Sequence, residues 1–310
     1  MALGISNLLV GMFTDRAHQT GCTVVLPPPG TVGGMAVRGG APGTREAAAL
    51  GPNGTVTECH AVVLCGSSLF GLAAADGVVS WCVEQERGLE LPAGRFPIVG
   101  AAVVLDLRDS RSRRIDREAG ISACRAATSD APQMGSVGVG TGCTVGKEAG
   151  REFAVKGGQG WAIKTAGPVS VGALIAVNAL GSVFDVDGTV LAGCTAPSEV
   201  PRFPFTAPDL PAAGSLANTV IGCIVTNARL AKSEACRVAD LGHTGIARTV
   251  SPAHTRLDGD ALFTLATGEV AASLDLIAHL AAESVAAAIR AGVRAAEPLP
   301  GRPADPRARG

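Results

Sequence analysis

The sequence contains no tyrosine, only four lysines and few aromatic residues of any kind. Aromatic residues make up 3% of the 310 positions, whereas 47% are apolar. A core for a chain of this length must therefore be built from Ala, Val and Leu, which favours sheets and helices that approach one another closely. The basic residues are nearly all Arg, the net charge is −1, and no basic stripe stands out, so a nucleic-acid partner is not expected.

Metal-binding and membrane-spanning patterns are also missing. None of the nine cysteines belongs to a C-x-x-C pair, and most lie inside apolar runs, so we predict small core hydrophobes in a reducing compartment. No run of 18 uncharged apolar residues occurs, so no membrane span is expected and a cytoplasmic location is favoured. The five histidines form no i, i+4 pair and have no Cys or carboxylate at metal-ligand spacing, so no metal site is predicted. Surface or capping roles are expected for His18, His60, His243, His254 and His279.

The order of patterns along the chain predicts an α+β layered fold. Gly and Pro separate strand-like runs at 22–26, 35–38, 62–64, 98–107, 135–145, 153–156, 161–164 and 169–177. A helix is predicted over 67–87, with Ser67 or Ser68 as its N-cap. After residue 219 follow a strand at 220–227, a helix at 231–249, a strand at 261–267 and a helix at 273–295. We expect one catalytic domain over 1–296 and a disordered tail at 297–310.

Two motifs suggest phosphate chemistry. The stretch "VFDVDGTVL" at 183–191 matches the nucleophile motif of haloacid-dehalogenase-type phosphatases, in which Asp185 would be phosphorylated and Asp187 would act as acid and base with Mg²⁺. Because it leads into another β-like segment, a hairpin turn is favoured and the phosphatase is kept as an alternative. The glycine-rich "VGVGTGCTVGKE" at 137–148 has Thr141 and Cys143 where phosphate-loop and dinucleotide patterns need Gly, so neither pattern is satisfied.

The stretch "GSLANTVIGCIVTNARL" at 214–230 runs from a proline-rich segment directly into a β-branched apolar run. It can be read as a loop that enters a strand, or as a processing site. If the bond before Thr219 broke, Thr219 would carry both a hydroxyl nucleophile and a free α-amino group that can act as a base near neutral pH. Such a residue needs no catalytic histidine.

Four segments resemble the self-processing N-terminal-nucleophile amidohydrolases, a family of DmpA-type L-aminopeptidase/D-esterases, β-aminopeptidases and nylon-oligomer hydrolases. They are "TGCTVVLPP" at 20–28, "VRGGAPGTRE" at 37–46, "SLANTVIGCIVTNARL" at 215–230 and "HTRLDGDALFTLAT" at 254–267. The resemblance places Thr219 on the family's nucleophile and Asn218 before the processed bond. It places Asn178, in "ALIAVNALG", where an amide side chain donates to the oxyanion.

The same resemblance assigns charged residues to the site. Asp258 and Asp260 fall on the pair that orients the nucleophile's amine. Two carboxylates this close should repel, so we expect that one of them either has a raised pKa or pairs with the α-ammonium group. Lys147, in "GKEAG", falls on a lysine that would polarise the nucleophile or pair with an Asp. Some members are thought to use a Tyr near the oxyanion; the corresponding region of this chain offers Leu105, which implies a more apolar pocket.

The resemblance therefore implies an αββα sandwich that cleaves itself into chains 1–218 and 219–310. The reaction would be amide hydrolysis through an acyl-enzyme on Thr219, on small peptides or on β- or ω-amino-acyl amides. No metal or organic cofactor is implied, and self-association into a tetramer of processed heterodimers is expected. The alternatives are a Mg²⁺-dependent phosphatase that uses Asp185, and an unprocessed scaffold without enzymatic activity.

Overall fold

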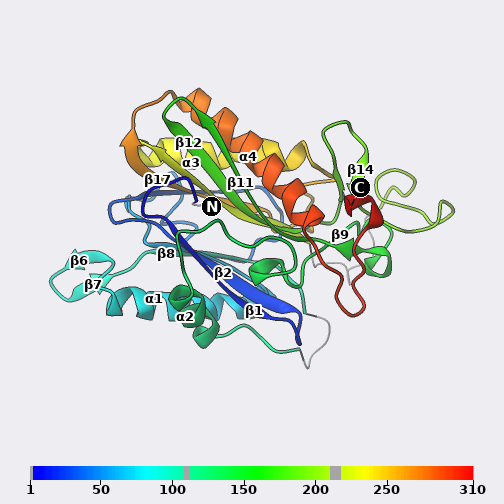
Figure 1. Cartoon of the computed structure of the whole chain (residues 1–310), viewed down its shortest axis with the longest axis horizontal. Coiled ribbons are helices and arrows are strands. Elements are labelled where there is room, and N and C mark those ends of the chain that lie inside the picture. The colour runs from blue at the N-terminus through cyan, green and yellow to red at the C-terminus, as the bar shows by residue number, and fades with distance from the viewer. Residues whose placement is uncertain (1–2, 108–111, 210–217, 310) are drawn as a thin grey trace.

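Two five-stranded sheets lie face to face between two layers of helices (Figure 1). The computed structural model describes residues 3–107, 112–209 and 218–309. The first sheet has the order β1 (Leu9–Asp15), β2 (Thr20–Leu26), β5 (Ala61–Cys65), β8 (Val99–Val103) and β4 (Thr44–Arg45). The second has the order β11 (Gly158–Ala166), β12 (Val169–Asn178), β15 (Thr219–Ala228), β17 (Ala261–Val270) and β3 (Val32–Val37).

Each sheet carries two helices on its outer face. Helices α1 (Ala73–Glu84) and α2 (Arg117–Arg125) cover the first sheet, and α3 (Lys232–Ala247) and α4 (Leu274–Arg294) cover the second (Figure 1). This arrangement confirms the α+β class and the αββα order. The remaining elements are short: β6 (Leu89–Leu91), β7 (Gly94–Phe96), β9 (Thr144–Val145), β10 (Val155–Lys156), β13 (Ser182–Phe184), β14 (Val190–Ala192), β16 (Val250–Ser251), and the 3-10 turns at Ser68–Leu72, Gly138–Gly140, Arg151–Phe153 and Pro306–Arg309.

Three apolar layers hold the sandwich together, one between the sheets and one under each helix layer. They consist mostly of Ala, Val, Leu and Ile, as the composition predicts. The layers approach closely because many contact positions are glycine: a Cβ at Gly160 of β11 would lie 1.8 Å from the carbonyl oxygen of Ala288 in α4. All nine cysteines are buried and free of disulfides, which confirms their prediction as core residues.

Helix α4 is long and apolar enough to cross a bilayer, and it is the one such helix within the described ranges. It lies on β11 and β12, and 67% of its apolar window is buried inside the protein. Burial of this kind is typical of the core helix of a layered fold.

Several local expectations were wrong. Residues 135–145 form a 3-10 turn and a two-residue strand instead of a long strand. Ser67 does not cap a helix: its φ is 68°, and its hydroxyl accepts a hydrogen bond from the backbone N of Ile115. Helix α2 and strand β1 were not predicted, because α2 is short and polar and because β1 has no clear alternation.

The C-terminal segment 297–309 packs against the body of the protein. Arg302 is 8% exposed and donates to the carbonyl oxygen of Asp106 at 2.6 Å, and the buried Asp305 accepts from the backbone N of Gly193 at 3.1 Å. This packing differs from the disordered tail that the Pro and Arg content predicts. The composition gave no sign of the buried charged contacts that hold the segment in place.

Candidate active site

Thr219 is the first residue of β15, the central strand of the second sheet. Its neighbour on the antiparallel side is Asn178, the last residue of β12, and on the parallel side Asn218 forms a bridge to Asp258 just before β17. The β-branched apolar run after Thr219 explains why a strand begins here, since such residues suit a strand buried on both faces. The sheet therefore brings four of the sequence-predicted residues to one end of three adjacent strands.

The Asn218–Thr219 bond is tightly surrounded. The Thr219 hydroxyl donates to the Asn218 carbonyl oxygen, which also accepts from the backbone N of Gly259 at 3.0 Å. A Cβ at Gly259 would lie 3.0 Å from Thr219 Oγ1 and 2.9 Å from the carbonyl oxygen of Ala41. Glycine at this position therefore leaves room for the Thr219 hydroxyl beside the Asn218 carbonyl group.

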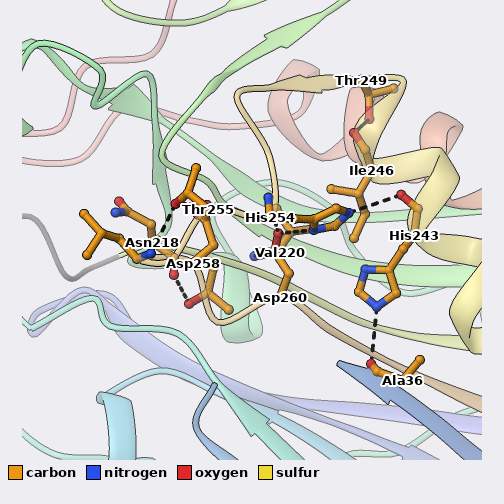
Figure 2. A network of polar contacts seen from close by, with 12 residues as sticks. Ala36, Asn218, Val220, His243, Ile246, Thr249, His254, Thr255, Asp258 and Asp260 are labelled. Carbon is orange, nitrogen blue, oxygen red and sulfur yellow. Dashed lines mark hydrogen bonds and ion pairs between the residues drawn. The ribbon is translucent and has the colours of Figure 1, made fainter. Parts of the chain in front are cut away.

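The two acidic residues have different partners (Figure 2). Asp260 Oδ1 accepts from the backbone N of Val220 at 2.6 Å, which ties it to the main chain that follows Thr219. Asp258 Oδ2 accepts from the backbone N and the hydroxyl of Thr255, at 2.8 and 2.6 Å. Burial and then the negative charge of Asp260 raise the pKa of Asp258 to about 6. The raised pKa of Asp258 agrees with the first of the two alternatives that the sequence leaves open for this pair.

Two histidines join this network, although neither was predicted to take part (Figure 2). His254 Nδ1 lies 2.6 Å from Asp260 Oδ2, and its ring meets that of His243 edge to face, with centroids 4.9 Å apart. Burial lowers the pKa of His254, but the hydrogen bond and charge of Asp260 outweigh it and leave the pKa raised. His243 contacts the carbonyl oxygen of Ala36 at 3.2 Å, and burial lowers its pKa to about 4.

The expected surface or capping roles are therefore wrong for His243, which is 4% exposed, and for His60, which is 7% exposed. They do not describe His254 either, since it pairs with a buried carboxylate. The available signal was the position of His254 inside the family-like segment at 254–267, because that segment also contains the two acidic residues.

Lys147 and Asn178 lie on the other side of Thr219 from the acidic pair, on the side of β12. Lys147 is 1% exposed, and its Nζ donates to the main-chain oxygen and Oδ1 of Asn178 at 2.8 and 3.1 Å. The backbone N of Thr144 also donates to Asn178 Oδ1, at 2.9 Å, so the Nδ2 group faces the carbonyl oxygen of Leu105 at 3.4 Å. Burial, and then the charge of Arg151, lower the pKa of Lys147 to about 7, so near neutral pH it can give or take a proton.

The glycine-rich block at 38–43 supports the acidic loop from the side. The backbone N atoms of Arg38 and Gly39 donate to the Asp260 carbonyl oxygen at 3.0 and 3.2 Å, and that of Ala41 donates to the Asp258 carbonyl oxygen at 2.8 Å. A Cβ at Gly39 would lie 2.3 Å from the carbonyl oxygen of Asp258. The unusual composition of this block therefore follows from the close approach of two backbones.

The phosphatase-like motif lies elsewhere and forms a turn. Strands β13 and β14 pair around it, and Gly188 adopts a φ of 83°. Asp185 forms an ion pair with Arg294 at 2.5 Å, and Asp187 accepts from the backbone N of Thr189 at 2.9 Å. The hairpin interpretation is confirmed. Within the described ranges, no group of three or more His, Cys, Asp or Glu residues is arranged to hold a metal ion.

Comparison with known proteins agrees with this geometry. The chain is 41% identical to an uncharacterised aminopeptidase of Mycobacterium tuberculosis, over 91% of this chain and 88% of the relative. It is 31% identical to a 6-aminohexanoate-oligomer endohydrolase of an Agromyces species, over 84% and 74% of the two chains. The L-aminopeptidase D-Ala-esterase/amidase of Ochrobactrum anthropi, described as a variant of the Ntn-hydrolase fold, superposes with a TM-score of 0.74 at 18% identity, over 99% of this chain and 91% of that one.

The architecture is thus that of the N-terminal-nucleophile hydrolases. A family model for peptidase family S58 matches residues 4–306, and the chain belongs to this family. Its class is that of a hydrolase acting on amide bonds.

Proposed function

We propose that Thr219 is the nucleophile of a self-processing amidohydrolase. The observation that carries this proposal is the position of Thr219 at the start of β15, with its hydroxyl on the Asn218 carbonyl oxygen and Asp260 on the next backbone N. A nucleophile at the end of a buried central strand is held rigidly, and the polar groups needed to activate it come from neighbouring strand ends.

The first reaction would be cleavage of the chain itself. Thr219 Oγ attacks the Asn218 carbonyl carbon and passes its proton to a base, for which Lys147, with a pKa of about 7, is suited. The C–N bond breaks, the nitrogen takes a proton, and an ester joins Asn218 to the threonine oxygen. Water then hydrolyses the ester and leaves chains 1–218 and 219–310, with a free amine on Thr219.

Substrate hydrolysis would repeat this chemistry. The Thr219 amine, with a pKa of about 8, takes the hydroxyl proton as Oγ attacks the substrate amide. Asp258 and Asp260 balance the charge of the amine. The Nδ2 group of Asn178 contacts the carbonyl oxygen of Leu105 at 3.4 Å, and a side-chain amide of this kind is suited to donate to the oxyanion. The acyl-enzyme is then hydrolysed by water.

The substrate class follows the relatives. They include a β-aminopeptidase of a Burkholderia species, with a TM-score of 0.75 at 21% identity over 99% of this chain and 91% of that one, and the 6-aminohexanoate-oligomer endohydrolase. We extend this to small peptides and β- or ω-amino-acyl amides, in a cytoplasmic tetramer of processed heterodimers. The main-chain oxygen of Leu105 lies 3.4 Å from Asn178 Nδ2, and a leucine at this position would make the pocket more apolar than a tyrosine would.

Intact mass spectrometry tests the nucleophile. The purified chain is incubated near neutral pH beside a Thr219→Ala variant, which lacks the hydroxyl, and a Thr219→Ser variant, which keeps it. We expect two fragments, the second beginning at residue 219, in the wild type and the serine variant and none in the alanine variant. A single uncleaved chain in all three would refute the proposal and favour an unprocessed scaffold.

A further inference from the structure

The residue that pairs with Asp260 has an uncommon backbone conformation. His254 has a φ of 56°, in the left-handed region that residues other than glycine seldom adopt. In this conformation its backbone N and its ring face one carboxylate oxygen: the backbone N lies 3.2 Å and ring Nδ1 2.6 Å from Asp260 Oδ2 (Figure 2). Backbone conformations of this kind cost free energy and cluster at functional sites. The proposed chemistry does not use His254.

Both ring nitrogens of His254 face oxygen atoms that accept hydrogen bonds. Nδ1 faces the Asp260 carboxylate, and Nε2 lies 3.5 Å from the main-chain oxygen of His243 (Figure 2). A neutral imidazole carries one N–H and would place a lone pair against one of these oxygens, whereas an imidazolium donates to both. Burial of the ring disfavours the charge, but the hydrogen bond and the charge of Asp260 outweigh it, and the pKa of His254 is raised. The contacts therefore favour the charged form of His254.

The ring of His243 lies against His254 as a neutral neighbour. Its Nε2 faces the carbonyl oxygen of Ala36 at 3.2 Å and therefore carries the N–H group. Burial lowers the pKa of His243 to about 4. The edge-to-face contact between the two rings thus supports His254 without placing a second positive charge beside it.

Charged groups around the pair of His254 and Asp260 come from several parts of the fold. They are Asp258 in the same loop, Arg38 after β3, Asp240 on α3, and Lys147 beside Asn178. Arg38 and Asp240 form an ion pair with each other, and the charge of Asp258 acts on Lys147. Two carboxylates and one imidazolium leave one negative charge next to Thr219. This charge matches the single α-ammonium group of the proposed mature nucleophile, and buried charges require such a partner.

We infer that His254 is a positioning residue that, as an imidazolium, keeps the Asp260 carboxylate charged and fixed on the backbone N of Val220. The inference rests on the proposed function and gives the two acids different tasks. Asp260 orients the main chain that follows Thr219, and Asp258 takes up the proton of the pair, with a pKa of about 6 that burial and then the charge of Asp260 raise. Without the charge of His254, the pair should take up its proton at a higher pH.

An NMR titration of the uncleaved Thr219→Ala chain tests this inference without any need for catalysis. The variant is His254→Asn, because asparagine tolerates the left-handed backbone and can donate to a carboxylate but carries no charge. The backbone N of Thr255 donates to Asp258 Oδ2 at 2.8 Å, so its amide signal follows the protonation of Asp258. We expect the midpoint of this signal to rise by about one to three pH units in His254→Asn, the usual effect of losing a nearby opposite charge. His279→Asn, a matched change at an exposed histidine of α4, should leave the midpoint unchanged.

The ring nitrogens of His254 provide a second reading from the same sample. In the parent chain at pH 6, both nitrogens should carry a proton, because the pKa of His254 is raised above its ordinary value of 6.5. A ring with one protonated nitrogen at this pH, or equal Thr255 midpoints in all three proteins, would overturn the inference.

Activity separates this inference from the proposed function. Hydrolysis of β-alanine p-nitroanilide is followed between about pH 5 and pH 9 in chains that retain Thr219, and the acid limb of kcat/KM should move to higher pH in His254→Asn. A uniform fall at every pH would indicate a merely structural role, and an acid limb that does not move while the wild type is active would refute the inference and leave the amidohydrolase standing. If the wild type cleaves nothing, the proposed function fails, and the Thr255 midpoint alone supports or overturns the charge-holding role of His254.

Discussion

Replacement of Lys147 by methionine should stabilise the protein at low pH and at the same time inactivate it. Lys147 is 1% exposed, and its pKa in the folded state is about 7, against 10.5 for an ordinary lysine. Below pH 7 the folded protein must therefore hold a buried ammonium group that the unfolded chain exposes to water. Methionine has a similar length and carries no charge, so it removes this requirement.

Proton linkage gives the direction and the size of the change in the free energy of unfolding with pH. Between pH 7 and pH 10.5 the unfolded chain binds a proton at this lysine and the folded protein does not, so the free energy of unfolding rises with pH. The slope is about 1.4 kcal/mol per pH unit, or about 5 kcal/mol over the whole interval. In Lys147→Met, loss of the hydrogen bonds from Nζ to Asn178 offsets about 1–3 kcal/mol of the gain from removing the buried ammonium group. Lys147→Met should thus be about 2–4 kcal/mol more stable than its parent at pH 6 and should lose this advantage by pH 10.

Urea unfolding at pH 6, 8 and 10 measures this difference. The comparison is made in the Thr219→Ala background, so that the chain stays in one piece and unfolding can be reversible. Lys156 is also buried with a pKa of about 7, but it is present in both proteins and cancels. Lys164→Met, a change at an exposed lysine, is the control and should show no such dependence on pH.

Activity provides the second half of this prediction. With Thr219 present, Lys147→Met should slow self-cleavage by about 10²- to 10⁴-fold, the range for loss of a general acid or base. A stability difference between Lys147→Met and its parent that stays constant from pH 6 to pH 10 would refute the reasoning, because the lysine would then titrate alike in the folded and unfolded states.

Three further changes probe the rest of the site. Asp260→Asn should slow self-cleavage by about 10²-fold, as followed by mass spectrometry. It should also remove the contribution of charged His254 to the free energy of unfolding, which is complete below pH 6.5 and is lost as the pH rises through the raised pKa of His254. An NMR titration of His254 that is the same in both proteins would contradict this. Asn178→Ala should lower kcat by about 10²- to 10³-fold with little change in KM, as expected for an oxyanion donor, and an effect on KM alone would argue against this role. Gly259→Ala should block self-cleavage while the fold persists by circular dichroism, because its Cβ would crowd the Thr219 hydroxyl at 3.0 Å; normal cleavage would show that this space is not needed.

Local patterns predicted much of the fold. The strand at 220–227 and the helices at 231–249 and 273–295 lie within two residues of β15, α3 and α4 at each end, because long periodic runs carry their own signal. The glycine-rich stretch at 135–145 was predicted wrongly. Its turn is stabilised by Lys156, which donates to the carbonyl oxygens of Gly140, Thr141 and Cys143 from a later strand.

The sequence alone determined the layered class, the small-residue core and the strand that follows Thr219, and its resemblance to a known family assigned six candidate site residues. These depend on local periodicity and on short motifs, which a chain carries whether or not it is folded. Only the tertiary structure decided that His254 pairs with Asp260, that Lys147 is buried against Asn178, and that Arg302 returns from the C-terminal segment to donate to the Asp106 carbonyl oxygen. Burial, pKa and charge environment depend on what distant segments bring to one place, and no local pattern encodes that.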